Sequence, residues 1–146
     1  MNKPKIFLDS SALVAGVLST TGAARALLVL SENENIESFI NEHIITECER
    51  TFARKVPEAL PELRNTIKNA MLKILNDPTP EKVQANLYLI QDPQDVAILL
   101  SALECKADFL VAHNRKHFTD DPQVAEKTGL RIGTPGDALE WIRAQR

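Results

Sequence analysis

The stretch KIFLDSSALVAG at residues 5–16 establishes the first strand and the first helix of the chain. Its apolar run IFL predicts a buried strand over residues 5–9. An aspartate, Asp9, stands where this run ends, and two small hydroxylated residues follow it. Ser10 or Ser11 can cap a helix that continues through ALVAGVL. The sequence therefore predicts a carboxylate at the carboxyl end of a core strand.

Strands and helices alternate along the rest of the sequence. Asn41 is the predicted N-cap of one helix, and Pro57 is predicted to end it. Residues 77–80 read as a loop and residues 83–90 as weakly extended. This alternation predicts an α/β fold with a parallel sheet and helices on both faces, in one domain over residues 1–146. Further strands are predicted at 36–40, 108–112 and 130–134, and helices at 23–33, 42–56 and 61–75 and from Pro93 and Pro135 onward.

The composition narrows the class of protein. The chain has 146 residues, of which 44% are hydrophobic and 25% charged, as expected for a globular domain. A net charge of −3 argues against a broad basic surface that binds nucleic acid non-specifically. No apolar run is long enough for a transmembrane helix, and the N-terminus lacks a signal-peptide core, so a cytoplasmic protein is expected. Cys48 and Cys105 are expected to be reduced, with no zinc motif around them.

Acidic residues recur where functional groups of a parallel sheet gather. Asp9 ends the first strand, Asp92 and Asp95 stand where a helix begins, and Glu47 lies about two turns into another helix. A simpler interpretation exists for each: Asp9 or Asp92 as a helix cap, Asp95 as a favourable first-turn acid, Glu47 as an exposed or paired side chain. Asn114, after the strand at 108–112, can simply belong to a turn. If the fold brings these carboxylates together, they repel one another unless a cation neutralises them. Mg²⁺ and Mn²⁺ are cations that prefer such oxygen ligands.

The sequence resembles the PIN-domain nucleases, which include the VapC-like toxin ribonucleases. The resemblance covers nearly the whole chain and rests on four blocks. It implies a three-layer α/β/α fold with a central, mainly parallel sheet and divalent-metal-dependent hydrolysis of RNA phosphodiester bonds. The blocks are FLDSSALVAG, ITECERTFARK, DPQDVAILLSALECKADFLVAHNRKHF and IGTPGDAL.

The resemblance also implies roles for individual residues. The catalytic positions of the family match Asp9, Glu47 and Asp95. The metal-binding positions match Asp9, Asp92, Asp95 and Asn114. Ser10 matches a small hydroxyl beside the first aspartate, and the basic residues that can meet phosphates are Arg50, Arg54, Arg115 and Lys116.

Two other functions compete with a nuclease. A non-catalytic PIN-like module that binds RNA or protein is favoured by Asn114 and Ala112, where many relatives have an aspartate and a hydroxyl residue, and opposed by the intact acidic set. An aspartyl phosphatase needs an aspartate where Ser11 stands. A receiver domain needs its phosphorylated aspartate after a later strand and a lysine after the last one, and IGTPGD has no lysine.

The resemblance also implies two protein partners. A toxin would have an antitoxin, and PIN-like toxins commonly pair. An apolar patch formed by Leu13, Val17, Leu27 and Leu30 is therefore predicted to support a homodimer.

Overall fold

The centre of the molecule is a five-stranded parallel sheet. The computed structural model describes residues 2–90, 92–113, 118 and 122–145. The strands lie in the order β3-β2-β1-β4-β5, so the first strand is the central one. Phe7 of β1 lies opposite Phe39 of β2 on one side and Leu110 of β4 on the other. The strand bounds are β1 Lys5–Leu8, β2 Glu37–Asn41, β3 Lys73–Leu75, β4 Phe109–Val111 and β5 Arg131–Gly133.

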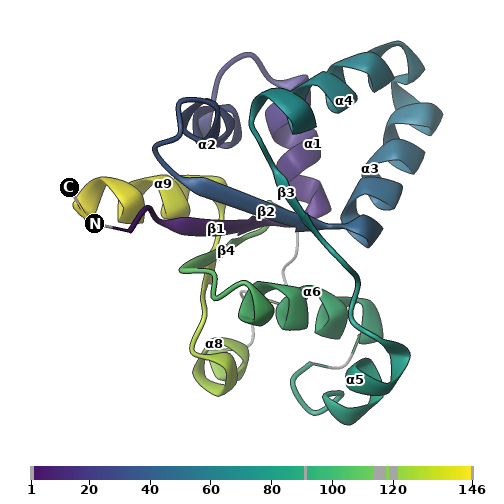
Figure 1. Ribbon diagram of the computed structural model, residues 1–146, viewed down its shortest axis with the longest axis vertical. Helices are drawn as coiled ribbons and strands as arrows, with labels where there is room; N and C mark the ends of the chain where they lie inside the picture. The colour runs from purple at the N-terminus through teal and green to yellow at the C-terminus, as the bar shows by residue number, and fades with distance from the viewer. Residues whose placement is uncertain (1, 91, 114–117, 119–121, 146) are drawn as a thin grey trace.

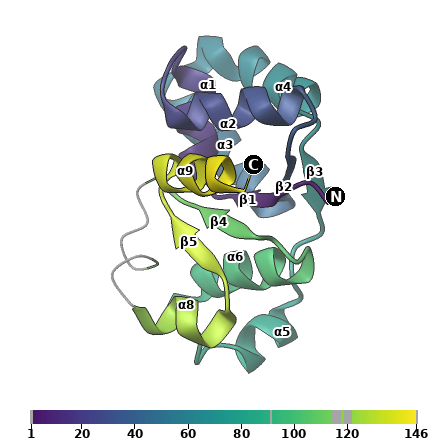
Figure 2. The same cartoon turned by 90° about the vertical axis from the view of Figure 1, so that its left-hand side faces the viewer.

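Helices cover both faces of this sheet, which confirms the predicted α/β/α layering (Figures 1 and 2). The helices on one face are α1 Ser10–Leu18, α2 Ala23–Glu32, α3 Glu42–Lys55, α4 Leu60–Asn69 and α9 Pro135–Ala144, with a short 3₁₀ turn at Pro57–Ala59. The helices on the other face are α5 Pro80–Ala85, α6 Pro93–Glu104 and α8 Pro122–Thr128. Because both faces are covered, the central strand is apolar throughout its middle: Ile6, Phe7 and Leu8 are all buried.

The order of the strands creates a switch point beside Asp9. From β1 the chain moves outward to β2 and β3, with its connecting helices on one face. It then returns to β4 and β5 with α5, α6 and α8 on the opposite face. The direction therefore reverses between β1 and β4, and in open parallel sheets ligands bind beyond the carboxyl ends of the strands at such a point. Asp9 follows β1 at this position.

Several predicted element boundaries are confirmed, and one cap is corrected. The Asn41 side chain accepts a hydrogen bond from the Ile44 N–H and so caps α3, which ends at Lys55 ahead of Pro57. The cap of α1 is Asp9, whose carboxylate accepts the Ser10 N–H at 2.7 Å. The prediction of a serine cap was wrong because the helix begins one residue earlier, with Ser10 already helical.

The predicted helix over 61–75 is too long. Helix α4 ends at Asn69, and residues 73–75 form the edge strand β3, pairing with β2. The apolar period Leu63, Ile67, Met71 continues past the true end, but Met71 has φ of 52° and 48% of its surface is exposed. A left-handed residue cannot continue an α-helix, so the chain turns there and enters the sheet.

Two short helices were not predicted. The segment read as extended over 83–90 contains the end of α5, which starts at Pro80 in the predicted loop and is capped by the Thr79 hydroxyl. Helix α8 lies between β4 and β5 and is seven residues long. A proline at the first position with Thr79 before it is a helix start signal, but six residues are too few to show a helical period.

The prediction of an exposed apolar patch for a homodimer was wrong, because its side chains are buried or partly buried. Leu13 is 0%, Leu27 is 1% and Val17 is 7% exposed, because α1 and α2 pack into the core rather than presenting these side chains outward. Leu30 is partly buried against the same core.

No single helix of the described chain has the length and apolar character to cross a membrane. Among the described helices, only α1 and α2 taken together reach that length and apolar character, and the chain bends by 89° between them.

Candidate active site

Asp9 is wholly buried at the carboxyl end of β1. Its backbone N–H donates to the Val111 carbonyl of β4 at 2.9 Å, so the residue is held between the two strands at the switch point. One carboxylate oxygen accepts the Ser10 N–H, and the other lies 3.4 Å from the Ser11 hydroxyl. These contacts orient a charged group inside the protein, where burying it is costly without polar partners.

Asp95 is the second wholly buried carboxylate, in the first turn of α6. This helix ends shortly before β4 begins, so it runs against the strands and starts at their carboxyl edge. Asp92 behaves differently: it is exposed, it caps α6, and its Oδ1 accepts the Gln94 N–H at 2.9 Å. The simpler interpretation of Asp92 as a helix cap is therefore confirmed, and its backbone lies outside the helix, with ψ of 121°.

Glu47 lies on α3 and is half-buried. Its Oε1 lies 3.3 Å from Nε2 of His43, one turn earlier on the same helix. The His43 backbone N–H also donates to Asp77, beyond β3. His43 was not predicted as a site residue, although its spacing of four residues from Glu47 is a detectable signal.

Cys48 links the surroundings of Asp9 and Glu47. The thiol is buried on α3 and donates to the Ser10 carbonyl at 3.7 Å, which ties α3 to the start of α1. Burial, and then the negative charges of Glu47 and Asp9, raise the pKa of this thiol to about 12. The segments that carry Asp9 and Glu47 therefore meet at this thiol, because Cys48 adjoins Glu47 and contacts Ser10, which adjoins Asp9.

The segment after β4 is attached to the same neighbourhood. The His113 N–H donates to the Ser11 hydroxyl at 3.0 Å, and the Ala112 N–H donates to the Gly133 carbonyl. Ser11 thus contacts both Asp9 and this segment. The sequence reading assigned the functional hydroxyl to Ser10, whose own hydroxyl lies 3.5 Å from Asp9.

A family comparison identifies the fold. The profile of the PIN domain matches residues 5–116, which include Asp9, Glu47 and Asp95. This chain belongs to the PIN-domain family. No curated protein matches its sequence.

Solved structures support the PIN fold of the chain. PAE2754 from Pyrobaculum aerophilum superposes with a TM-score of 0.67 at 17% identity, over 97% of this chain and 96% of that one. VapBC2 from Rickettsia felis, bound to a DNA fragment from its promoter, gives a TM-score of 0.64 at 17% identity, over 89% of this chain and 98% of that one. At such identities the likeness establishes the fold.

The remaining predicted site residues of this PIN domain are solvent-facing or undescribed. Arg50 and Arg54 are exposed on α3, the helix that carries Glu47. Asn114, Arg115 and Lys116 lie outside the described residues.

The donor set of the PIN domain has the right chemistry for a hard cation, but it is incomplete in the described part of the chain. Asp9, Asp95 and Glu47 offer carboxylate oxygens, the atoms that Mg²⁺ and Mn²⁺ prefer. Within residues 2–90, 92–113, 118 and 122–145, no three His, Cys, Asp or Glu side chains are grouped to hold a metal ion.

A hollow of about 430 Å³ opens beside this edge of the PIN domain, between the N-termini of α2 and α9. His113, Thr21 and Thr134 are among its lining residues. It therefore adjoins the segment that Ser11 holds against Asp9.

Proposed function

We propose that this PIN domain is a divalent-metal-dependent endoribonuclease whose site lies at the switch point between β1 and β4. The observation that carries the proposal is the complete burial of two aspartates, Asp9 and Asp95, at the starts of two helices on the carboxyl edge of one sheet. Ionised carboxylates in a protein interior need positive charge or hydrogen-bond donors. A divalent cation would supply that charge.

Asp9 and Asp95 would hold Mg²⁺ or Mn²⁺, with Asp92 and the amide oxygen of Asn114 as further ligands. When bound, the ion activates a water molecule and stabilises negative charge on the phosphate. Glu47 is the half-buried carboxylate of the set, so it remains accessible to water and is the group we assign to accept the proton of the attacking water. His43 orients Glu47 through its Nε2 contact.

RNA would approach across the exposed side of α3 and the segment after β4. Arg50 and Arg54 are solvent-facing on the helix that carries Glu47, where they can meet phosphates. Arg115 and Lys116 would add positive charge, Ser10 would line the path, and the hollow beside His113 would take a neighbouring nucleotide.

The decisive experiment is cleavage of a single-stranded RNA with the purified protein in Mn²⁺, Mg²⁺ or chelator. Asp95→Asn should abolish cleavage, because it removes one charge from the site with almost no change of shape. Asp108→Asn is the matched control: this aspartate accepts the Lys5 N–H at 2.8 Å at the opposite edge of the sheet, so its loss should leave cleavage unchanged. Cleavage that persists in chelator, or in Asp95→Asn, would contradict the proposal.

The competing function is a PIN-fold module that binds RNA or protein without cleaving it. The absence of a three-residue metal group among the described side chains favours it. Metal-independent RNA binding with no cleavage by the wild type would establish this alternative.

We also propose that the protein is the toxin of a toxin–antitoxin pair that acts in the cytoplasm. The likeness to VapBC2 supports a second protein partner. Both cysteines are free thiols, as a reducing compartment requires. A small DNA-binding protein encoded by the adjacent gene would support the pairing, and its co-expression should suppress cleavage.

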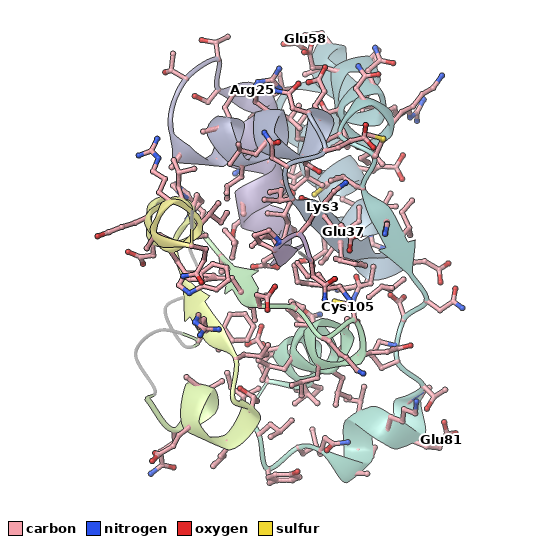
Figure 3. The ribbon with its side chains drawn as sticks, turned by 60° about the vertical axis from the view of Figure 1, so that its left-hand side comes forward. Lys3, Arg25, Glu37, Glu58, Glu81 and Cys105 are labelled. Atoms are coloured by element: carbon pink, nitrogen blue, oxygen red, sulfur yellow. The ribbon has the colours of Figure 1, made fainter. Side chains whose placement is uncertain are left out.

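The surface that best suits such a partner is a groove of about 540 Å³ between α2 and α9. Val29, Leu30 and Ile142 supply apolar lining, and Arg25 and Arg143 supply positive charge (Figure 3 labels Arg25). If two copies of the chain met at this groove about a two-fold axis, their arginines would face one another and repel. An acidic antitoxin segment therefore fits the groove better than a second copy does. Val29→Glu should weaken antitoxin binding and leave RNA cleavage by the isolated protein unchanged.

A homodimer is a separate proposal. Sedimentation at tens of micromolar, about the range in which a standard interface persists, should show a dimer; a monomer would contradict it.

A further inference from the structure

Two buried polar side chains, Asn41 and Ser101, meet beneath the candidate site. Both are 0% exposed, and the Asn41 Nδ2 donates to the Ser101 hydroxyl oxygen at 2.9 Å. The other end of the same amide accepts the Ile44 N–H at 2.9 Å and caps α3. One side chain therefore starts α3 and also bonds to α6, sixty positions further along the chain.

The two helices joined in this way carry different parts of the acidic set. Glu47 and the thiol of Cys48 lie on α3, whereas Asp95 lies on α6, six residues before Ser101. Asn41 ends β2 two residues beyond Phe39, and Asp9 stands two residues beyond Phe7, the partner of Phe39 in β1. The contact thus lies where the supports of Asp9, Glu47 and Asp95 come together.

A hydrogen bond in this place constrains the helices more than apolar packing does. It is directional, and displacing α6 from the end of β2, where α3 begins, would separate a donor and an acceptor that water does not reach. Other buried side chains of α6, among them Ile98 and Leu99, are aliphatic, and the hydrophobic effect that buries them is not directional.

We propose that the Asn41–Ser101 hydrogen bond is a positioning contact that fixes α6 to the end of β2, where α3 begins, and with it the separation of Glu47 and Asp9 from Asp95. This inference rests on the proposed metal site, which requires those carboxylates to converge. Asn41 and Ser101 are positioning residues, because they act through the carboxylates that the two helices carry.

The test compares three variants by calorimetric titration with Mn²⁺ and by thermal melting. Ser101→Ala removes the acceptor, and Asn41→Ser removes the Nδ2 donor while keeping a good N-cap. Ser31→Ala is the matched control: its buried hydroxyl donates to the Ala70 carbonyl at 2.6 Å, between α2 and the end of α4. We expect Mn²⁺ binding to weaken about tenfold or more in the first two variants, as for other residues that orient metal ligands, and less than twofold in the control.

A second readout does not depend on metal. In a Cys105→Ser background, Cys48 is the only thiol, and its rate of reaction with a disulfide reagent reports how tightly α3 packs on α1. Ser101→Ala and Asn41→Ser should speed this reaction several-fold, and Ser31→Ala should not.

The outcomes separate the two proposals. Wild-type Mn²⁺ affinity and an unchanged thiol rate in both Asn41→Ser and Ser101→Ala would overturn the positioning role, even if melting temperatures fall. A wild type that binds no Mn²⁺ would overturn the metal site, and the thiol rates would then decide the positioning of α3 on their own.

Discussion

The backbone N–H of His113 donates to the hydroxyl of Ser11 at 3.0 Å, across 102 positions of the chain. The same hydroxyl lies 3.4 Å from the carboxylate of Asp9. A single small side chain therefore connects the aspartate that ends β1 to the segment that follows β4. Since Asn114 comes next, Ser11 couples the position of Asp9 to the entry of that segment.

Replacing Ser11 tests this connection. Ser11→Ala should lower RNA cleavage about tenfold, because the His113 N–H loses its acceptor and the segment after β4 loses its attachment, at a stability cost of about 1 kcal/mol. Ser10→Ala should have a smaller effect, since the shorter contact of Asp9 with that residue is to the backbone N–H. Cleavage rates and urea unfolding of the two variants give the comparison; equal losses of cleavage would contradict the assignment to Ser11.

The two roles of Asp9 can be separated by substitution. Asp9→Asn keeps a side-chain oxygen that can accept the Ser10 N–H, so α1 stays capped, but the negative charge is lost. It should abolish cleavage and change stability little. Asp9→Ala should abolish cleavage and also cost about 0.5–2 kcal/mol, the usual price of a lost N-cap. Thermal melts with cleavage assays check both, and an active Asp9→Asn would show that Asp9 serves only as a cap.

Position 114 is expected to set the affinity for metal. Asn114→Asp adds one negative charge to the proposed ligand set, and divalent affinity rises with ligand charge. The variant should bind Mg²⁺ or Mn²⁺ more tightly than the wild type and be slightly less stable without metal, because the carboxylates then repel one another more strongly. Calorimetric titration and melting curves test this. Unchanged metal affinity would mean that residue 114 does not face the metal.

The buried thiol of Cys48 makes stability sensitive to alkaline pH. Its pKa is raised from 9.0 to about 12, first by burial and then by Glu47 and Asp9, so the folded chain keeps a proton that the unfolded chain releases. This contribution is fully present below pH 9 and is lost as the pH rises towards 12, with a slope approaching about 1.4 kcal/mol per pH unit. Urea unfolding from pH 8 to 10.5 measures it.

Variants at the two cysteines provide the control for this pH dependence. Cys48→Ala should flatten the alkaline decline. Cys105→Ser should remove a smaller part, because the pKa of that thiol is raised only to about 11. Cys105, labelled in Figure 3, is the C-cap of α6, at the opposite end of that helix from Asp95. An identical decline in the wild type and in Cys48→Ala would refute the role of this thiol.

The central strands and the long helices were predictable because their signals are local. The apolar runs of β1 and β4, the Asn41 cap and the proline starts of α6 and α9 each lie within a few neighbouring residues. Strand β3 was not predictable in this way: only three residues long, it is defined by pairing with β2, and Leu75 happened to continue the helical period of α4.

The residues of the candidate site also differ in whether a local sequence signal marks them. Asp9 and Asp95 could be selected from their positions at a strand end and a helix start, and both are buried there. Ser11 and Ser101 could not be selected, since their contacts reach across 102 and 60 positions and leave no local pattern. The cap role of Asp92 was predictable, because an aspartate directly before Pro93 at a helix start is a local signal.

The central place of β1 has a consequence for how the protein is made. β1 is made before the other described strands of this sheet, yet it is flanked by β4, and the Asp9 N–H bonds to Val111, more than one hundred residues later in the chain. A growing chain can pair β1 with β2, but the candidate site stays open on one side until β4 emerges. The candidate site of this protein can therefore be completed only late in translation, after β4 has been made.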